Sequence, residues 1–230
     1  ATAGERAGAV LGRANELWNR GRPAEAAQWL DTLYSINKNS GTIQALLAAG
    51  YYGGAQPDTS KLERDQIDYL LLLRGDTVAG KRVLAVFRER AAKDTLQRGW
   101  FRIAPLTEAI LAVKRNDPAA ERLVDHADSL WRGQFGNANW ASIQLARLYQ
   151  VQGRTDRALR AVRRRWMPLG MPEPVGLAES YRLEGQLAAK VGDRQAAINS
   201  YKNYLKLRFD PDSSRIPQRD SVRAEYAAIA

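Results

Sequence analysis

The feature that most constrains the fold of this chain is a unit that recurs along its 230 residues. Each copy consists of a segment rich in Ala and Leu, a two-residue turn, and a second segment with a small residue near its start. The turns of the three clearest copies are Gly21-Arg22, Gly153-Arg154 and Gly192-Asp193. Because glycine readily adopts the left-handed conformation that ends a helix, and a polar residue can cap the next one, each copy predicts two antiparallel helices.

Small residues take corresponding positions in these copies. They are Ala14, Ala146 and Gly185 in the first helices and Ala26, Ala158 and Ala197 in the second helices. Small side chains let the two helices of a pair approach closely, and larger residues fill the remaining space. Each pair exposes an apolar face that only a neighbouring pair covers, so we expect the units to stack into a single domain over residues 1–230.

At these residues the chain resembles tetratricopeptide repeats, most closely over residues 181–211. The resemblance implies an all-α fold, a right-handed superhelical solenoid of antiparallel helix pairs, with about eleven or twelve helices. Abundant Ala, Leu and Arg also favour helices over sheets. The clearest predicted units are 5–37, 137–166 and 177–211, followed by a capping helix at 214–230. Residues 200–230 further resemble the C-terminal helical-repeat region of large bacterial signalling proteins.

The middle of the chain, residues 61–133, is a degenerate version of the repeat. Two further interhelix turns are predicted there, at Arg74-Gly75-Asp76 and at Arg115-Asn116-Asp117. Breaks between helices are expected where Gly, Pro and polar residues gather. The predicted breaks are residues 38–41, 52–60, 99–105, 133–139 and 167–175.

The composition excludes several kinds of catalytic or metal site. The chain has no cysteine, which rules out disulfides, thiolate zinc sites and cysteine nucleophiles. His126 is the only histidine, and the sequence flags no nucleophile and orienting acid to accompany it. We therefore expect a chain that is not an enzyme and that has no catalytic residue, cofactor or metal ion.

Residues 75–82 come close to a phosphate-binding loop, with two glycines and then Lys81. The loop should end in Ser or Thr to hold magnesium, but Arg82 stands there, and the alternating strands and helices of a nucleotide-binding sheet are missing. We therefore interpret Gly75-Asp76 as an interhelix turn and expect no nucleotide at Lys81.

The formal net charge of +10 attracts nucleic acid, anionic lipid or an acidic protein surface. The strongest apolar run, residues 69–73, is far shorter than the roughly 18 to 20 residues that span a bilayer. We expect a soluble chain without a membrane span. Because it begins with Ala1 rather than Met, we expect a processed protein or a fragment, and its compartment, cytoplasmic or extracytoplasmic, stays open.

One candidate binding surface is the concave groove that the first helix of each pair would line. In recognition of a helix or an extended peptide, the contacts would come from polar side chains on these helices. The candidates are Asn15, Asn139, Gln144, Arg147 and Arg182.

A second candidate surface is an arginine stripe made by Arg157, Arg160 and Arg164, which fall on one face of a predicted helix. Such a stripe suits phosphates or an acidic peptide, whereas the alternative is a solvated set of cations near a helix C-terminus. Of the six tryptophans, Trp100 and Trp166 lie beside predicted loops and are expected to be the most exposed.

The leading hypothesis is a non-catalytic interaction module or scaffold that binds a peptide or protein with an acidic surface, as the sensor or adaptor part of a bacterial signalling protein. The alternative is a structural accessory subunit of a stable multi-protein complex. A basic RNA-binding repeat protein comes third, because the repeated set of base-reading side chains that it needs is missing. No small-molecule substrate is expected.

Overall fold

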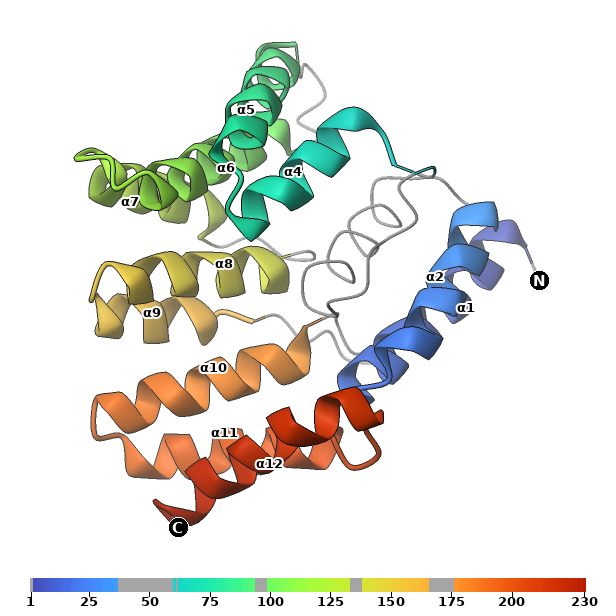
Figure 1. Ribbon diagram of the computed structural model, residues 1–230, viewed down its shortest axis with the longest axis vertical. Helices are drawn as coiled ribbons and strands as arrows, with labels where there is room; N and C mark the ends of the chain where they lie inside the picture. The colour runs from blue at the N-terminus through green and yellow to red at the C-terminus, as the bar shows by residue number, and fades with distance from the viewer. Residues whose placement is uncertain (1, 37–59, 61, 94–98, 133–137, 166–175) are drawn as a thin grey trace. The chain divides into compact units, whose positions relative to one another are not determined.

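The described residues of the computed structural model form helices and the turns that join them (Figure 1). They are 2–36, 60, 62–93, 99–132, 138–165 and 176–230, and they form eleven α-helices, one short 3-10 helix and no strand. The prediction of an all-α fold is therefore confirmed. The superhelical arrangement of the pairs stays a prediction.

The contacts between residues group the chain into two compact units. Unit 1 combines residues 1–57 with residues 162–230, and unit 2 is residues 58–161. The expectation of a single domain over residues 1–230 is not tested by this division and stays a prediction.

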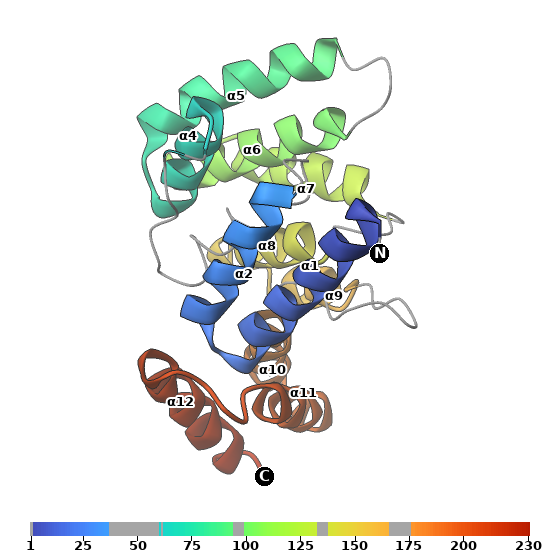
Figure 2. The same ribbon diagram turned by 90° about the vertical axis from the view of Figure 1, so that its right-hand side faces the viewer.

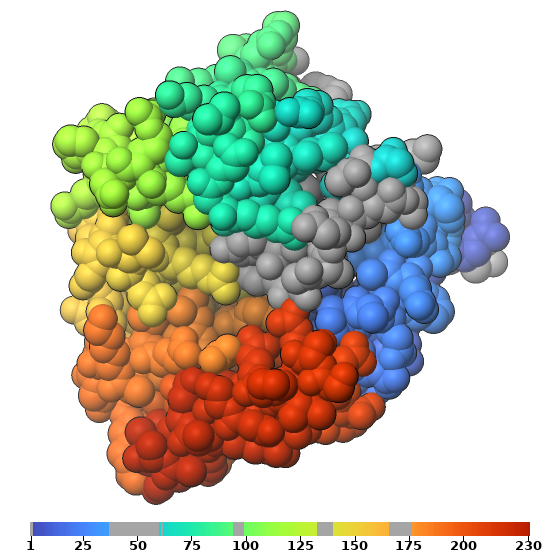
Figure 3. All heavy atoms as spheres, viewed as in Figure 1, coloured from blue at the N-terminus to red at the C-terminus, as the bar shows by residue number. Residues whose placement is uncertain are grey.

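Unit 1 is built from two helix pairs and a closing helix. Its elements are α1 (Ala3–Arg20), α2 (Pro23–Ile36), α10 (Leu177–Lys190), α11 (Arg194–Leu207), the 3-10 helix η2 (Ser213–Arg215) and α12 (Ile216–Ala227). The helix α1 pairs with α2, α10 pairs with α11, and α1 also packs on α10. The closing helix α12 packs on α11, and its side chains cover part of the α10–α11 pair in Figure 3.

Unit 2 is a run of helices in which each contacts the next from α4 to α8. Its elements are α4 (Arg64–Arg74), α5 (Thr77–Ala92), α6 (Trp100–Lys114), α7 (Ala120–Trp131), α8 (Ala138–Val151) and α9 (Thr155–Val162), whose last residue falls in unit 1. The helix α6 is central, because it contacts α4, α5, α7 and α8. Figure 2 shows α5 and α6 stacked one above the other.

All five interhelix turns predicted from the sequence are present, and they share one hydrogen-bond pattern. In each, a residue with positive φ donates its N–H to the carbonyl three residues back, and the next residue donates to the carbonyl five residues back. The positive-φ residues are Gly21, Gly75, Asn116, Gly153 and Gly192. This pattern satisfies carbonyls that the end of a helix leaves without partners.

Acidic side chains after two of these turns cap the second helix, as predicted. The Asp76 carboxylate accepts the N–H groups of Val78 and Ala79, both at 2.9 Å. The Asp193 carboxylate accepts the N–H of Ala196 at 3.2 Å. The segment that resembles a phosphate-binding loop is therefore the end of α4, a capped turn and the start of α5.

The predicted break at residues 99–105 is wrong, because α6 begins at Trp100 and continues through Pro105. Proline removes one backbone hydrogen bond from a helix interior. The burial of Leu106 and Ile110, 0% and 2% exposed, outweighs this loss. The other predicted breaks lie wholly or largely outside the described residues, and α8 starts inside one of them, at Ala138.

Small residues are buried where the paired helices approach each other. A Cβ atom added at Gly185 would lie 2.5 Å from the ring of Tyr201 on the partner helix. Across the pair, Ala197 is fully buried. Larger side chains at these positions would push α10 and α11 apart.

We expect Ala197→Leu to lower the free energy of unfolding by about 1 to 3 kcal/mol, because it overpacks a close helix contact. Ala227→Leu, on an exposed position of α12, is the matched control and should change stability little. Urea unfolding of both variants measures the difference. A stable Ala197→Leu beside an unstable Ala227→Leu would show that the repeat register is wrong.

Candidate functional site

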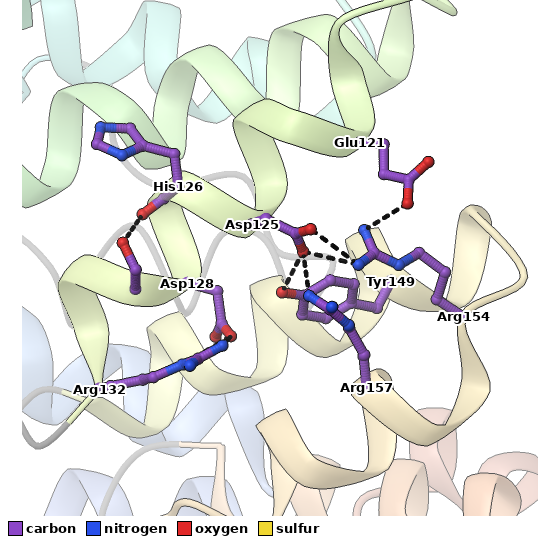
Figure 4. A network of polar contacts seen from close by, with 9 residues as sticks. Glu121, Asp125, His126, Asp128, Arg132, Tyr149, Arg154 and Arg157 are labelled. Atoms are coloured by element: carbon purple, nitrogen blue, oxygen red, sulfur yellow. Dashed lines mark hydrogen bonds and ion pairs between the residues drawn. The ribbon is translucent and has the colours of Figure 1, made fainter.

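In unit 2, the carboxylate of Asp125 on α7 is the centre of a polar cluster (Figure 4). It accepts hydrogen bonds from Tyr149 Oη at 3.0 Å, from Arg154 Nη2 at 2.8 and 2.9 Å, and from Arg157 Nη1 at 2.7 Å. Arg154 also reaches Glu121 on α7 at 3.4 Å. The cluster therefore ties α7 to α8, α9 and the turn between them.

Burial and charge act in opposite directions on Asp125. Burial favours its protonated form, but hydrogen bonds from Arg154 and Tyr149 outweigh this and lower the pKa of the carboxyl below its ordinary value. Burial, then the charge of Asp128 and the hydrogen bond to Asp125, raise the pKa of Tyr149 to about 12. Tyr149 therefore stays protonated and donates to Asp125 at neutral pH.

His126 takes no part in this cluster. Its ring points away from Asp125 in Figure 4, and its backbone carbonyl accepts a hydrogen bond from Ser129 Oγ at 2.7 Å. The side chain of His126 is exposed.

In unit 1, Glu184 of α10 is the centre of a second cluster. It accepts a hydrogen bond from Arg163 Nε at 3.0 Å and a short one from Arg165 Nη1. Arg163 also reaches Asp193 at 2.8 Å, and the Arg165 guanidinium lies 4.4 Å from the centre of the Tyr181 ring. The segment that follows α9 is thereby fixed to the α10–α11 pair.

Arg208 joins the first helix pair of the chain to the last one. It is 2% exposed, and its guanidinium donates to the backbone carbonyl of Trp18 at 2.8 Å and, over a short distance, to Glu179. The Trp18 carbonyl lies at the C-terminus of α1, where a cation interacts favourably with the helix dipole. Gly21 in the adjoining turn accepts the N–H of Asp212 at 2.9 Å.

Between α5, α6 and α7 of unit 2 lies a cleft of about 340 Å³. Leu84, Leu111 and Leu123 contribute apolar surface to it, while Lys81 and Arg115 contribute cations. Unlike the arginines of the two clusters, these two cations form no ion pair within the part of the chain that the structure describes. The cleft is therefore the candidate binding site, because it combines a concave surface with charges that are available to a partner.

The five residues predicted to line a groove differ in how far they are buried and in the residues that they contact. Asn15 and Gln144 are buried, 7% and 4% exposed, so they contribute to the interior. Arg147 is half-buried, and Arg182 reaches Glu225 of α12 at 3.5 Å. The side chain of the fifth candidate, Asn139, lies outside the described part of the structure.

The three arginines of the predicted stripe also differ. Arg157 binds Asp125, Arg164 is half-buried, and Arg160 is exposed and forms no ion pair among the described residues. Trp100 is half-buried, with its ring 5.1 Å from that of Phe87. Trp166 lies outside the described residues, and among the tryptophans that the structure describes the exposed one is Trp29, at 39%.

Sequence reasoning missed the cleft and the contacts of Arg208 with Trp18 and Glu179. The only signal for the cleft was Lys81, which drew attention as part of a near-motif, while Arg115 was noted only beside its turn. Arg208 and Trp18 are 190 residues apart in the chain, so no local spacing relates them.

Comparisons with known proteins add no relative: no family model, no curated protein and no solved structure matches the chain. Among the described helices, none combines the length and the apolar character needed to cross a membrane. Within the same residues, no group of three or more His, Cys, Asp or Glu side chains is placed to hold a metal ion.

We expect Arg208→Met to lower the free energy of unfolding by about 3 to 5 kcal/mol, because it leaves the Glu179 carboxylate buried and unpaired. Arg223→Met is the control, since Arg223 and Asp220 form an exposed pair whose loss costs at most about 1 kcal/mol. Urea unfolding measures the free energy of unfolding of both variants. Equal losses would contradict a structural role for the contacts of Arg208. Adding Glu179→Leu to Arg208→Met should restore much of the loss, because it removes the unpaired charge.

We expect Tyr149 to make stability depend on alkaline pH. Folding raises its pKa from 10.0 to about 12, so its contribution is fully present below pH 10.0 and is lost as the pH rises through about 12. Tyr149→Phe should show a shallower fall in stability over that interval, measured by urea unfolding at each pH. Tyr201 and Tyr204 also have raised pKa values and remain in both proteins, so the difference isolates Tyr149. If the free energy of unfolding falls equally with pH in both proteins, Tyr149 is not the source of the dependence.

Proposed function

We propose that this chain is a non-catalytic interaction module that binds a protein or peptide with an acidic surface. The observation that carries the proposal is the repetition of one helix–turn–helix construction, with the same hydrogen-bonded turn at all five predicted positions. Repeated helix pairs provide extended surfaces on which side chains vary without disturbing the turns and close contacts that hold the pairs. A tetratricopeptide-like superhelix, serving as the sensor or adaptor part of a bacterial signalling protein, is the finer form of this proposal.

The distribution of the positive charge supports the acidic character proposed for the partner. The net charge is +10, but many arginines are paired with carboxylates of the chain itself, such as Arg82 with Asp68 and Arg163 with Glu184. Exposed cations without an ion pair among the described residues, including Lys81, Arg115 and Arg160, are the ones available to a partner. Such charges increase the rate of association with an acidic surface.

A second candidate function is a structural subunit of a stable complex. It is favoured by large apolar side chains that stay exposed, with Val151 at 73%, Val78 at 63% and Phe209 at 60%. In a permanent complex such side chains are covered by the partner.

The test begins with the purified chain on a resin, a cell extract of its source and a blank resin as control, with bound proteins identified by mass spectrometry. The identified partner is then purified, and its association with the chain is measured by surface plasmon resonance at increasing salt. We expect saturable binding whose association rate falls as salt rises, because screening weakens the attraction. Binding that does not respond to salt would contradict the acidic partner, and no saturable binding would contradict the proposed function.

Two sets of variants separate the surfaces. Arg157→Glu with Arg160→Glu and Arg164→Glu reverses the stripe, and Arg147→Ala with Arg182→Ala alters the predicted groove. A loss of affinity mainly in the groove variant supports recognition by the first helices, whereas a loss mainly in the stripe variant supports the structural-subunit alternative. Melting curves are needed for both, because Arg157 and Arg182 also pair with Asp125 and Glu225.

A further inference from the structure

The floor of the cleft in unit 2 is apolar, and its side chains are packed against the helices beneath it. Leu84 of α5 and Leu111 of α6 are 6% and 5% exposed, so they are packed by the helices beneath them and present only a small surface to the cleft. Gly80 helps to hold α5 in place, because a Cβ there would lie 2.6 Å from Leu72 and 3.0 Å from Leu111. The glycine before Lys81 thus serves helix packing, and the lysine that follows it lies at the cleft.

Five charged side chains surround this floor. Arg88 of α5 pairs with Glu108 of α6 at 2.7 Å, and Asp117 accepts the N–H of Ala119 at 2.8 Å within its turn. Lys81 and Arg115 are exposed and form no ion pair among the described residues. The charge available at the cleft is therefore positive, and it lies beside an apolar floor.

We propose that this cleft binds an acidic amphipathic segment of the partner protein, with apolar side chains on the leucines and carboxylates at Lys81 and Arg115. The volume of about 340 Å³ lies near the small end of the range for binding sites, which suits a few side chains of a segment. The apolar floor matches one face of an amphipathic segment, and the two cations match acidic residues that border that face.

The composition of the cleft favours a protein segment over nucleic acid. Binding of single-stranded nucleic acid without sequence preference relies on aromatic side chains on which bases stack. The ten described residues that line the cleft include no aromatic side chain.

This inference rests on the proposed function and assigns a surface to it. The probe is a fluorescein-labelled synthetic peptide with leucines along one helical face and glutamates on both sides of that face. Two control peptides replace its glutamates by glutamine or its leucines by alanine. Fluorescence anisotropy with the full chain at low salt should show saturable binding that weakens with either control peptide, because charge and apolar contact act together.

Three variants test whether the peptide binds at the cleft. Lys81→Glu and Arg115→Glu should each weaken binding about tenfold or more, because each places a negative charge beside the glutamates of the peptide. Ala85→Trp should also weaken binding, since Ala85 lines the cleft at an exposed position and a large ring there fills the space without a change of charge. Lys202→Glu is the matched control, with the same charge change at an exposed site of α11, outside the cleft lining.

Circular dichroism and melting curves confirm that each variant is folded. The proposal is overturned if the peptide does not bind saturably, or if Lys202→Glu weakens binding as much as Lys81→Glu. It is also overturned if a single-stranded RNA oligomer binds more tightly than the peptide and depends on Lys81.

The partner identified by resin capture separates this inference from the proposed function. If that partner binds the Lys81→Glu Arg115→Glu double variant normally, the cleft assignment fails and the proposed function stands. If resin capture yields no protein that binds saturably but the peptide binds as described, the cleft assignment stands and the proposed function is contradicted.

Discussion

Five of the described helix pairs depend on a short chain reversal, with two to five residues between the helices, and each reversal depends on one residue in the left-handed conformation. The same two backbone hydrogen bonds close the turn at Gly21, Gly75, Gly153 and Gly192. Asn116 makes the turn without glycine, at φ 53°, because asparagine tolerates this conformation better than other residues with a side chain. Once the reversal is fixed, two helices lie side by side, and small residues such as Ala197 decide how closely they pack.

Charge has two separate uses in this molecule. Buried or half-buried arginines join helices by binding carboxylates, as Arg208 does with Glu179 and Arg154 with Asp125. Taking such charges out of water is costly, so each pair stabilises the structure only because further hydrogen bonds accompany it. Exposed cations that form no ion pair among the described residues, such as Lys81, Arg115 and Arg160, stay available to a partner. The number of basic residues in the sequence therefore overstates the number of cations that are available to a partner.

The cleft between α5, α6 and α7 brings available charge and apolar surface together. It forms because α5 and α6 are held close at Gly80, while Lys81 and Arg115 come from the start of one helix and the end of the other. The phosphate-loop interpretation considered for residues 75–82 does not describe this segment, where Asp76 caps α5 and Gly80 lies inside it. This combination of an apolar floor and available cations is the basis of the proposed recognition of an acidic segment.

The sequence by itself determined the helical class, the five turns and the small residues at the close contacts, because these follow from the conformations of neighbouring residues and from helical spacing. The helix break predicted at Pro105 was wrong, because the burial of Leu106 and Ile110 outweighs the hydrogen bond that the proline removes. Only the tertiary structure decided which polar residues are available, since that depends on carboxylates from distant parts of the chain. Asn15 and Gln144 were expected in a groove and are buried, and Arg157 is bound to Asp125, whereas Arg160 stays exposed. Helix identity is a local property, but the exposure and pairing of a charge are set by the helices that pack around it.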